Sequence, residues 1–245
     1  MPVMGLGSWP AIFIRPEGQK GFCMKELKNQ KIWVCWKYAE VDGRITKKPF
    51  AVTGMPTGTD SPHKDEWSTY DEAVVAAGNP EFCFDGVGFV MPEGVFLLDI
   101  DHKDSNDPIF TAIRALFPTY TEISPSGHGY HIYGRADLTR IPQSWNEKEG
   151  CWKLATNYYS KNSEKDLEIY IGGLTNRFGT FTGNMLETVD TVTECTDAVL
   201  TFLDTYMKKP EERTAFAKLD TERFIRFSED QIPEILDFIS QIFHP

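Results

Sequence analysis

The chain has 245 residues, and its 25 lysines and arginines against 36 aspartates and glutamates give a formal net charge of −11. Hydrophobic residues make up 41%, which is typical of a folded globular protein and excludes a mostly disordered chain. No apolar run reaches the roughly 20 residues that a membrane-spanning helix needs, and residues 1–14 lack the basic start of a secretory signal. The five cysteines are odd in number and widely spaced, which excludes a full disulfide framework, and they form no Cys-x-x-Cys pair, which argues against a zinc knuckle. This cysteine usage favours a reducing compartment such as the cytoplasm.

The first predicted elements form a β-hairpin. Residues 31–39 and 44–52 are β-prone and flank Asp42-Gly43, a dipeptide typical of tight hairpin turns. Basic side chains outnumber acidic ones only in residues 1–60, and ordinary solvated lysines explain that excess.

The chain up to residue 186 then alternates between β-prone and helical patterns. Helices are predicted at 68–77, with Ser68 as N-cap, and at 108–117, with Asp107 as N-cap. Further strands are predicted at 86–91, 95–100, 119–124, 130–134, 167–173 and 177–183. Residues 92–94 suit a tight hairpin turn, whereas 139–165 show no clear pattern. Helical spacing returns at 191–208 and 229–243.

Asp99 and Asp101 are the first candidate functional residues. They end an apolar run, and alternate residues of a strand face the same side, so both carboxylates project together while Leu98 and Ile100 face the core. Neighbouring carboxylates repel unless a cation lies between them, and oxygen ligands suit Mg²⁺ or Mn²⁺. Two solvated aspartates at a strand end would give the same pattern.

Glu168 is the candidate third carboxylate. It alternates with the aliphatic residues of 167–171, and a neighbouring strand could bring it beside the two aspartates. Three acids around two metal ions are a common arrangement for in-line phosphoryl transfer. Glu168 could equally be the exposed half of an amphipathic strand.

A second set of candidates suits an anion. Glycines in a tight turn let backbone N–H groups approach a phosphate, while hydroxyl, imidazole and guanidinium groups donate to it. The candidate phosphate-binding residues are Ser124, Ser126, Gly127, His131, Arg177 and, as a possible template or phosphate contact, Lys48. A plain Gly/Ser turn with a satisfied core histidine is the alternative interpretation.

In this order the motifs resemble those of the archaeo-eukaryotic primase superfamily, in particular the primase–polymerase (prim-pol) domains of phages and plasmids. The hydrophobic-Asp-hydrophobic-Asp motif lies at 98–101, the small-x-His motif at Gly129 and His131, and the strand-borne acid at Glu168. Asp-x-Asp alone is common, but the ordered set is specific. The resemblance covers roughly residues 31–186, and many relatives carry serine where Gly129 stands.

The resemblance implies an α+β fold with a prim-pol catalytic domain at 1–186. This domain would combine a smaller N-terminal α/β subdomain at about 1–85 with an RRM-like antiparallel core at about 86–186. A helical extension at 187–245 would begin a primase-associated C-terminal region, so the chain is expected to be a fragment.

The resemblance also implies a function and its residues. Asp99, Asp101 and Glu168 would bind two Mg²⁺ or Mn²⁺ ions. The triphosphate of a dNTP or NTP would be bound by His131, together with Ser126 and Arg177. The expected activity is template-directed DNA priming and polymerisation on single-stranded DNA during phage or plasmid replication. The expected partner is a helicase, as a further domain or a separate protein.

Two other functions stay open. A rolling-circle initiator or related nuclease would use His128 and His131 for metal and a tyrosine as nucleophile, although a three-residue spacing does not place both histidines on one strand face. A catalytically inactive fold could serve as a DNA-binding module.

Overall fold

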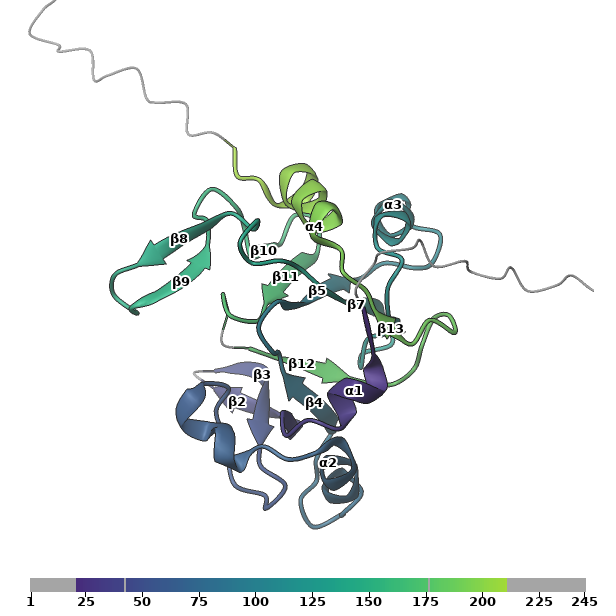
Figure 1. The fold of residues 1–245 in the computed structure, drawn as a ribbon. Coiled ribbons are helices and arrows are strands. Elements are labelled where there is room, and N and C mark those ends of the chain that lie inside the picture. The colour runs from purple at the N-terminus through teal and green to yellow at the C-terminus, as the bar shows by residue number, and fades with distance from the viewer. Residues whose placement is uncertain (1–20, 42, 176, 211–245) are drawn as a thin grey trace, which may run out of the picture. The chain divides into compact units, whose positions relative to one another are not determined.

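A computed structural model describes residues 21–41, 43–175 and 177–210. The chain divides between Lys209 and Pro210, so nearly all described residues belong to one compact unit. The fold is mixed α+β, with mainly antiparallel sheets and few helices (Figure 1), and at this level the predicted α+β class is confirmed. None of the described helices is long and apolar enough to cross a membrane.

The larger sheet has five strands, all paired antiparallel. Their order across the sheet is β10 (Lys161–Asn162), β11 (Leu167–Ile171), β5 (Val95–Asp101), β7 (Gly129–Arg135) and β6 (Thr121–Ile123). On β5, Leu98 and Ile100 are fully buried while Asp99 and Asp101 keep partial exposure, so the predicted alternation of faces is confirmed.

The second sheet has four antiparallel strands. Their order is β12 (Phe178–Phe181), β4 (Gly86–Val90), β2 (Trp33–Val41) and β3 (Arg44–Phe50). The predicted hairpin around Asp42-Gly43 is confirmed, because β2 and β3 pair from Cys35 with Phe50 to Val41 with Arg44.

Two short pairs complete the strands. One joins β1 (Phe22–Cys23) to β13 (Thr191–Val192). The other is the hairpin of β8 (Gln143–Asn146) and β9 (Cys151–Leu154), which fills part of the segment left unassigned from the sequence. Trp145 and Trp152 pair across this hairpin with ring centroids 5.5 Å apart, a contact that stabilises an otherwise isolated two-stranded sheet.

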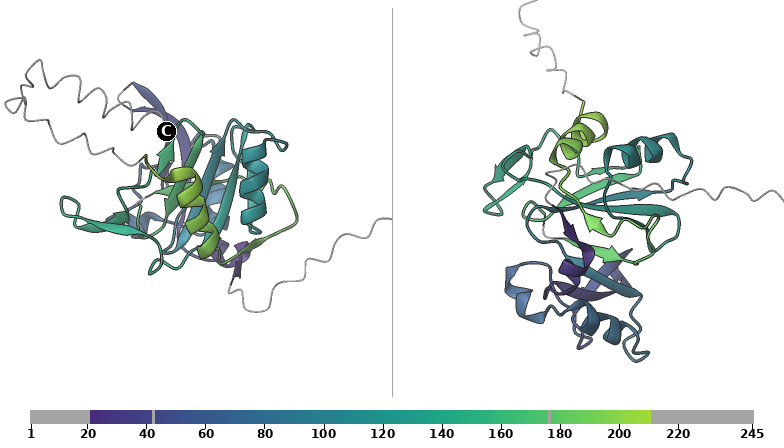
Figure 2. Two further views of the ribbon diagram at one scale, coloured as in Figure 1. Left: turned by 90° about the horizontal axis from the view of Figure 1, so that it is seen from above. Right: turned by 45° about the vertical axis from the view of Figure 1, so that its right-hand side comes forward.

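The helices lie around the two sheets (Figures 1 and 2). The elements are α1 (Met24–Lys28), α2 (Tyr70–Ala77), α3 (Pro108–Leu116), α4 (Thr196–Phe202), a 3₁₀ turn (Ser61–Glu66) and a π turn (Leu203–Met207). Side chains of α3 and α4, such as Phe110, Ile113 and Phe202, form one core with the five-stranded sheet. A second core lies between the two sheets, and α2 packs on the smaller sheet.

Local signals predicted the N-caps of α2 and α3 to within one residue. Asp107 caps α3 as predicted, accepting hydrogen bonds from two backbone N–H groups with Pro108 in the first turn. The predicted N-cap Ser68 of α2 is wrong. Thr69 is the cap, because it forms a reciprocal capping box with Glu72, whereas the Ser68 hydroxyl donates to the Trp33 carbonyl.

The predicted hairpin turn at residues 92–94 is also wrong. Residues 92–94 join β4 of the smaller sheet to β5 of the larger sheet, and these two strands do not pair with each other. Both are apolar because each is buried between layers, a pattern that does not reveal the partner strand.

The smaller sheet is built from strands of both halves of the predicted catalytic domain. The predicted division near residue 85 does not separate the two sheets, since β4 and β12 both lie in the smaller sheet with β2 and β3. The compact unit extends to Lys209, so residues 187–209 of the predicted helical extension lie within it. The predicted helix at 191–208 begins only at Thr196, because Thr191 and Val192 pair with β1. The predicted helix at 229–243 lies outside the described residues.

Candidate active site

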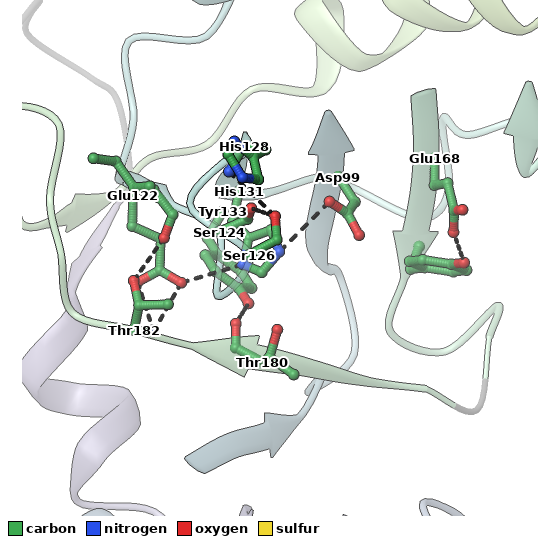
Figure 3. A network of polar contacts seen from close by, with 12 residues as sticks. Asp99, Glu122, Ser124, Ser126, His128, His131, Tyr133, Glu168, Thr180 and Thr182 are labelled. Atoms are coloured by element: carbon green, nitrogen blue, oxygen red, sulfur yellow. Dashed lines mark hydrogen bonds and ion pairs between the residues drawn. The ribbon is translucent and has the colours of Figure 1, made fainter. Parts of the chain in front are cut away.

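Antiparallel pairing aligns polar side chains in a row across the five-stranded sheet. The register pairs each member with the next, and the row runs Lys161, Glu168, Asp99, His131, Glu122. Because directly opposed residues project from the same face, all five side chains point toward the smaller sheet (Figure 3 shows four of them). Asp101, two residues beyond Asp99, extends the acidic group along β5.

Asp99 stands at the centre of this row and is largely buried. Its Oδ1 has no hydrogen-bond partner, and Nε2 of the His131 imidazole lies 3.5 Å from it. Burial raises the pKa of the Asp99 carboxyl above its ordinary value, and the neighbouring Asp101 and Glu168 carboxylates raise it further, while His131 and Lys47 oppose the shift. An acceptor left in this state is suited to an incoming cation.

Glu168 is already paired. One of its oxygens contacts the ammonium group of Lys161 and the other accepts from the Tyr170 hydroxyl. Hydrogen bonding to Glu168 raises the pKa of the Lys161 ammonium, so Lys161 stays charged. Lys161 therefore supplies the positive charge that balances this side of the acidic row.

The other end of the row is fully buried. His131 is 1% exposed and Glu122 0%, with Nδ1 of the imidazole 3.2 Å from Glu122 Oε1. His131 thus connects the buried Glu122 to the partly exposed Asp99 (Figure 3). The prediction that His131 and Tyr133 share a strand face is confirmed, because Tyr133 also points to the smaller sheet and donates to the Thr180 carbonyl.

A cleft of about 560 Å³ opens over the row. The five-stranded sheet contributes three carboxylates, from Asp99, Asp101 and Glu168, together with His131. Lys47 of β3, Lys161 of β10 and Arg177 add positive charge, and Tyr38, Tyr170 and Phe178 add aromatic surface. The cleft therefore combines a group of acids with nearby cations, a combination that suits a metal-bound polyphosphate.

The structure brings together only part of the sequence-predicted set. Asp99, Asp101, Glu168, His131 and Arg177 all line the cleft. The predicted contact Lys48 does not line it, because adjacent residues of β3 point to opposite faces and Lys47 takes the cleft side.

The turn before β7 lies outside the cleft lining. Ser124, Ser126 and Gly127 hold the turn through its own hydrogen bonds, with the two serine hydroxyls 3.1 Å apart and Ser126 accepting from the His128 N–H. His128 is exposed whereas His131 is buried, so the described geometry does not pair the two histidines.

Gly129 has a steric reason to be glycine. A Cβ at this position would lie 2.3 Å from the Ile100 carbonyl oxygen, since Gly129 pairs directly with Asp101 across β5 and β7. Backbone cannot yield as a flexible side chain does, so a serine at this position does not fit this backbone.

Sequence reasoning missed four residues of the site. Glu122, Lys161, Tyr170 and Lys47 are brought in by cross-strand pairing or by the second sheet. One signal was available, since Tyr170 shares the strand face of Glu168. Nothing local marked Glu122 or Lys161.

The residues fit a divalent cation by donor type, with one qualification. In the part of the chain that the structure describes, no three His, Cys, Asp or Glu side chains form a ready-made metal cluster. Both Glu168 oxygens are engaged, and metal binding would require Lys161 to move. The unpartnered buried Oδ1 of Asp99 next to Asp101 nevertheless supplies the hard oxygen donors that Mg²⁺ and Mn²⁺ prefer.

Comparisons with known proteins supply no family for this chain. No protein-family model matches it, and no curated protein sequence shows a significant match. The cleft and the sequence motifs are therefore the features from which a function can be proposed.

Proposed function

We propose that this protein is a template-directed nucleotidyltransferase, a primase–polymerase that extends DNA on a single-stranded template. The observation that carries the proposal is one cleft in which Asp99, Asp101 and Glu168 stand on paired strands close to Lys47 and Arg177. The five-stranded antiparallel sheet with α3 and α4 on its outer face is the element that we assign to an RRM-like core.

In this proposal the acids hold divalent ions and the basic groups hold the nucleotide. Asp99, Asp101 and Glu168 would ligate two Mg²⁺ or Mn²⁺ ions, which lower the pKa of the attacking hydroxyl and offset charge on the triphosphate. His131, Lys47 and Arg177 would contact the phosphates of a dNTP or NTP. Lys161 would release Glu168 when the positive charge of the ions replaces its own.

The reaction is an in-line displacement. The 3′-oxygen of the growing strand bonds to the α-phosphorus, the bond from that phosphorus to the bridging oxygen breaks, and pyrophosphate leaves while the hydroxyl proton passes to solvent. The protein contributes by orienting the reactants and stabilising charge. Phage or plasmid replication in a bacterial cytoplasm, with a helicase as partner, is the setting that we propose.

Primer extension tests the proposal. We expect the wild type to extend a primer on single-stranded DNA with Mn²⁺, and Asp99→Ala/Asp101→Ala to lose at least about a hundredfold in rate. The matched control is Glu147→Ala, which removes an exposed carboxylate of the β8–β9 hairpin outside the cleft. Circular dichroism establishes that each variant is folded, and an unprimed reaction reports priming. Extension that survives in the double variant would refute the assignment of the site.

The main competing function is an inactive DNA-binding module. It is favoured by one observation, the full engagement of both Glu168 oxygens by Lys161 and Tyr170. Calorimetric titration with a nucleotide, with and without Mn²⁺, separates the two functions. An inactive module binds DNA without metal-dependent triphosphate binding, whereas a polymerase binds the nucleotide more tightly when Mn²⁺ is present.

A further inference from the structure

Glu122 is a buried acid that the proposed chemistry does not use. Its side chain is 0% exposed, although a buried carboxylate is costly unless donors surround it. Three hydrogen-bond donors besides His131 surround the Glu122 carboxylate. The Thr182 and Gly183 N–H groups donate at 2.9–3.2 Å, and the Tyr120 hydroxyl donates at 2.9 Å.

The donors are divided unevenly between the two oxygens. Oε2 accepts from the Tyr120 hydroxyl, from the Gly183 N–H and, at 3.2 Å, from the Thr182 N–H. Oε1 accepts from the Thr182 N–H at 3.0 Å and faces Nδ1 of His131 at 3.2 Å. Backbone N–H groups can only donate, and they reach both oxygens, so Glu122 acts as an acceptor and the shared proton in the contact with His131 sits on Nδ1.

This arrangement fixes the imidazole of His131. With its proton on Nδ1, the ring presents Nε2 to Asp99 Oδ1, at 3.5 Å, and to the cleft. A carboxylate behind a histidine commonly sets its tautomer and orientation in this way.

We propose that Glu122 is a positioning residue that holds His131 with its proton on Nδ1 and its Nε2 toward the nucleotide site. The effect of Glu122 on catalysis rests on the proposed function, whereas the position of the proton on the His131 ring does not depend on it. Glu122 also ties β6 to the segment that follows β12, and that purely structural role must be tested separately.

The substitution Glu122→Gln separates the two roles. Tyr120 and Gly183 donate only to Oε2, and Thr182 reaches both oxygens, so the glutamine carbonyl oxygen is expected at the Oε2 position and its NH₂ group at the Oε1 position. A donor facing Nδ1 can be satisfied only if Nδ1 carries no proton. The ring is then expected to move its proton to Nε2, while the fold keeps the hydrogen bonds to Oε2.

Nitrogen NMR of the imidazole measures the outcome directly. We expect two-bond proton–nitrogen spectra, at a pH where the ring is neutral, to show protonated Nδ1 in the wild type and protonated Nε2 in Glu122→Gln. His131→Gln assigns the signal. The matched control Tyr120→Phe removes a donor to the same carboxylate without touching Nδ1, so it should destabilise the junction and leave the tautomer unchanged.

The results either support the inference or overturn it. A wild-type ring protonated on Nε2, or an unchanged tautomer in a folded Glu122→Gln, would refute it even if the protein is a polymerase. If the tautomer switches as expected and the protein extends primers, we expect the Mn²⁺ concentration for half-maximal extension to rise by roughly tenfold, because the Nε2–H group then donates to Asp99 Oδ1 and competes with the ion. A switched tautomer without any nucleotide binding would refute the proposed function and leave the placement of Glu122 standing.

Discussion

The charge on Asp99 should reduce the stability of the metal-free protein, and Asp99→Asn tests this. The carboxylate is largely buried with Oδ1 unpartnered, and burial raises its pKa above the ordinary aspartate value. A buried polar atom without a partner costs about 1–3 kcal/mol, and the isosteric amide removes the charge while keeping the shape. We expect a gain of about 1 kcal/mol for Asp99→Asn, or about 2–4 °C in Tm for a folded unit of this size.

The sign of the effect depends on pH. Because the folded-state pKa is raised, the protonated Asp99 favours the folded state, and this contribution is fully present below the unfolded pKa and is lost as pH rises through the folded value. The advantage of Asp99→Asn should therefore be largest at neutral pH. It should disappear below the ordinary range for aspartate, about pH 4, where the wild type is protonated in both states.

A divalent ion should reverse the ranking. If Asp99 is a ligand, Mn²⁺ at a hundredfold excess over its Kd stabilises the wild type by about 2.7 kcal/mol, equivalent to about 5–10 °C, and stabilises Asp99→Asn much less. Thermal unfolding followed by circular dichroism, with and without Mn²⁺, measures both effects, and Glu147→Gln serves as the exposed control. An Asp99→Asn variant that is less stable than the wild type at neutral pH without metal would refute the charge argument. Equal Mn²⁺ shifts in the two proteins would refute the metal site.

Three further predictions concern buried positions. Gly129→Ser should destabilise by about 1–3 kcal/mol, because its Cβ meets the Ile100 carbonyl oxygen at 2.3 Å, and an unchanged denaturation midpoint would contradict this. Tyr133→Phe should lower stability by about 1–3 kcal/mol, since it removes the 2.7 Å hydrogen bond to the Thr180 carbonyl that joins the two sheets; chemical denaturation measures the loss. Burial raises the pKa of Cys195 to about 12, so mass spectrometry should find it unmodified by maleimide at pH 8 until the protein is denatured, and rapid labelling of the native protein would exclude this.

The residues that face the cleft from a single strand were predictable. Asp99 and Asp101 share a face because side chains alternate along any strand, and the same rule places Glu168 opposite its aliphatic neighbours. The capping signal at Asp107 and the turn signal at Asp42-Gly43 are likewise short-range, and both were correct.

The neighbours of these residues were not predictable, because pairing between strands joins positions far apart in the chain. The sequence does not state which strands are adjacent, so Glu122 beside His131 and Lys161 beside Glu168 had no local signal. The apolar strands β4 and β5 read as a hairpin although they enter different sheets.

The sequence by itself determined the periodicity of each element and therefore which residues share a face, since alternation in strands and capping in helices depend only on neighbours in the chain. It did not determine which face of a strand lines the cleft. On β3 the tertiary structure places Lys47 in the cleft lining and leaves Lys48 out of it. Nor did the sequence determine that Oδ1 of Asp99, at the centre of the site, would be buried without a hydrogen-bond partner. Burial and the absence of a donor depend on how two sheets pack together, and that information exists only in the tertiary structure.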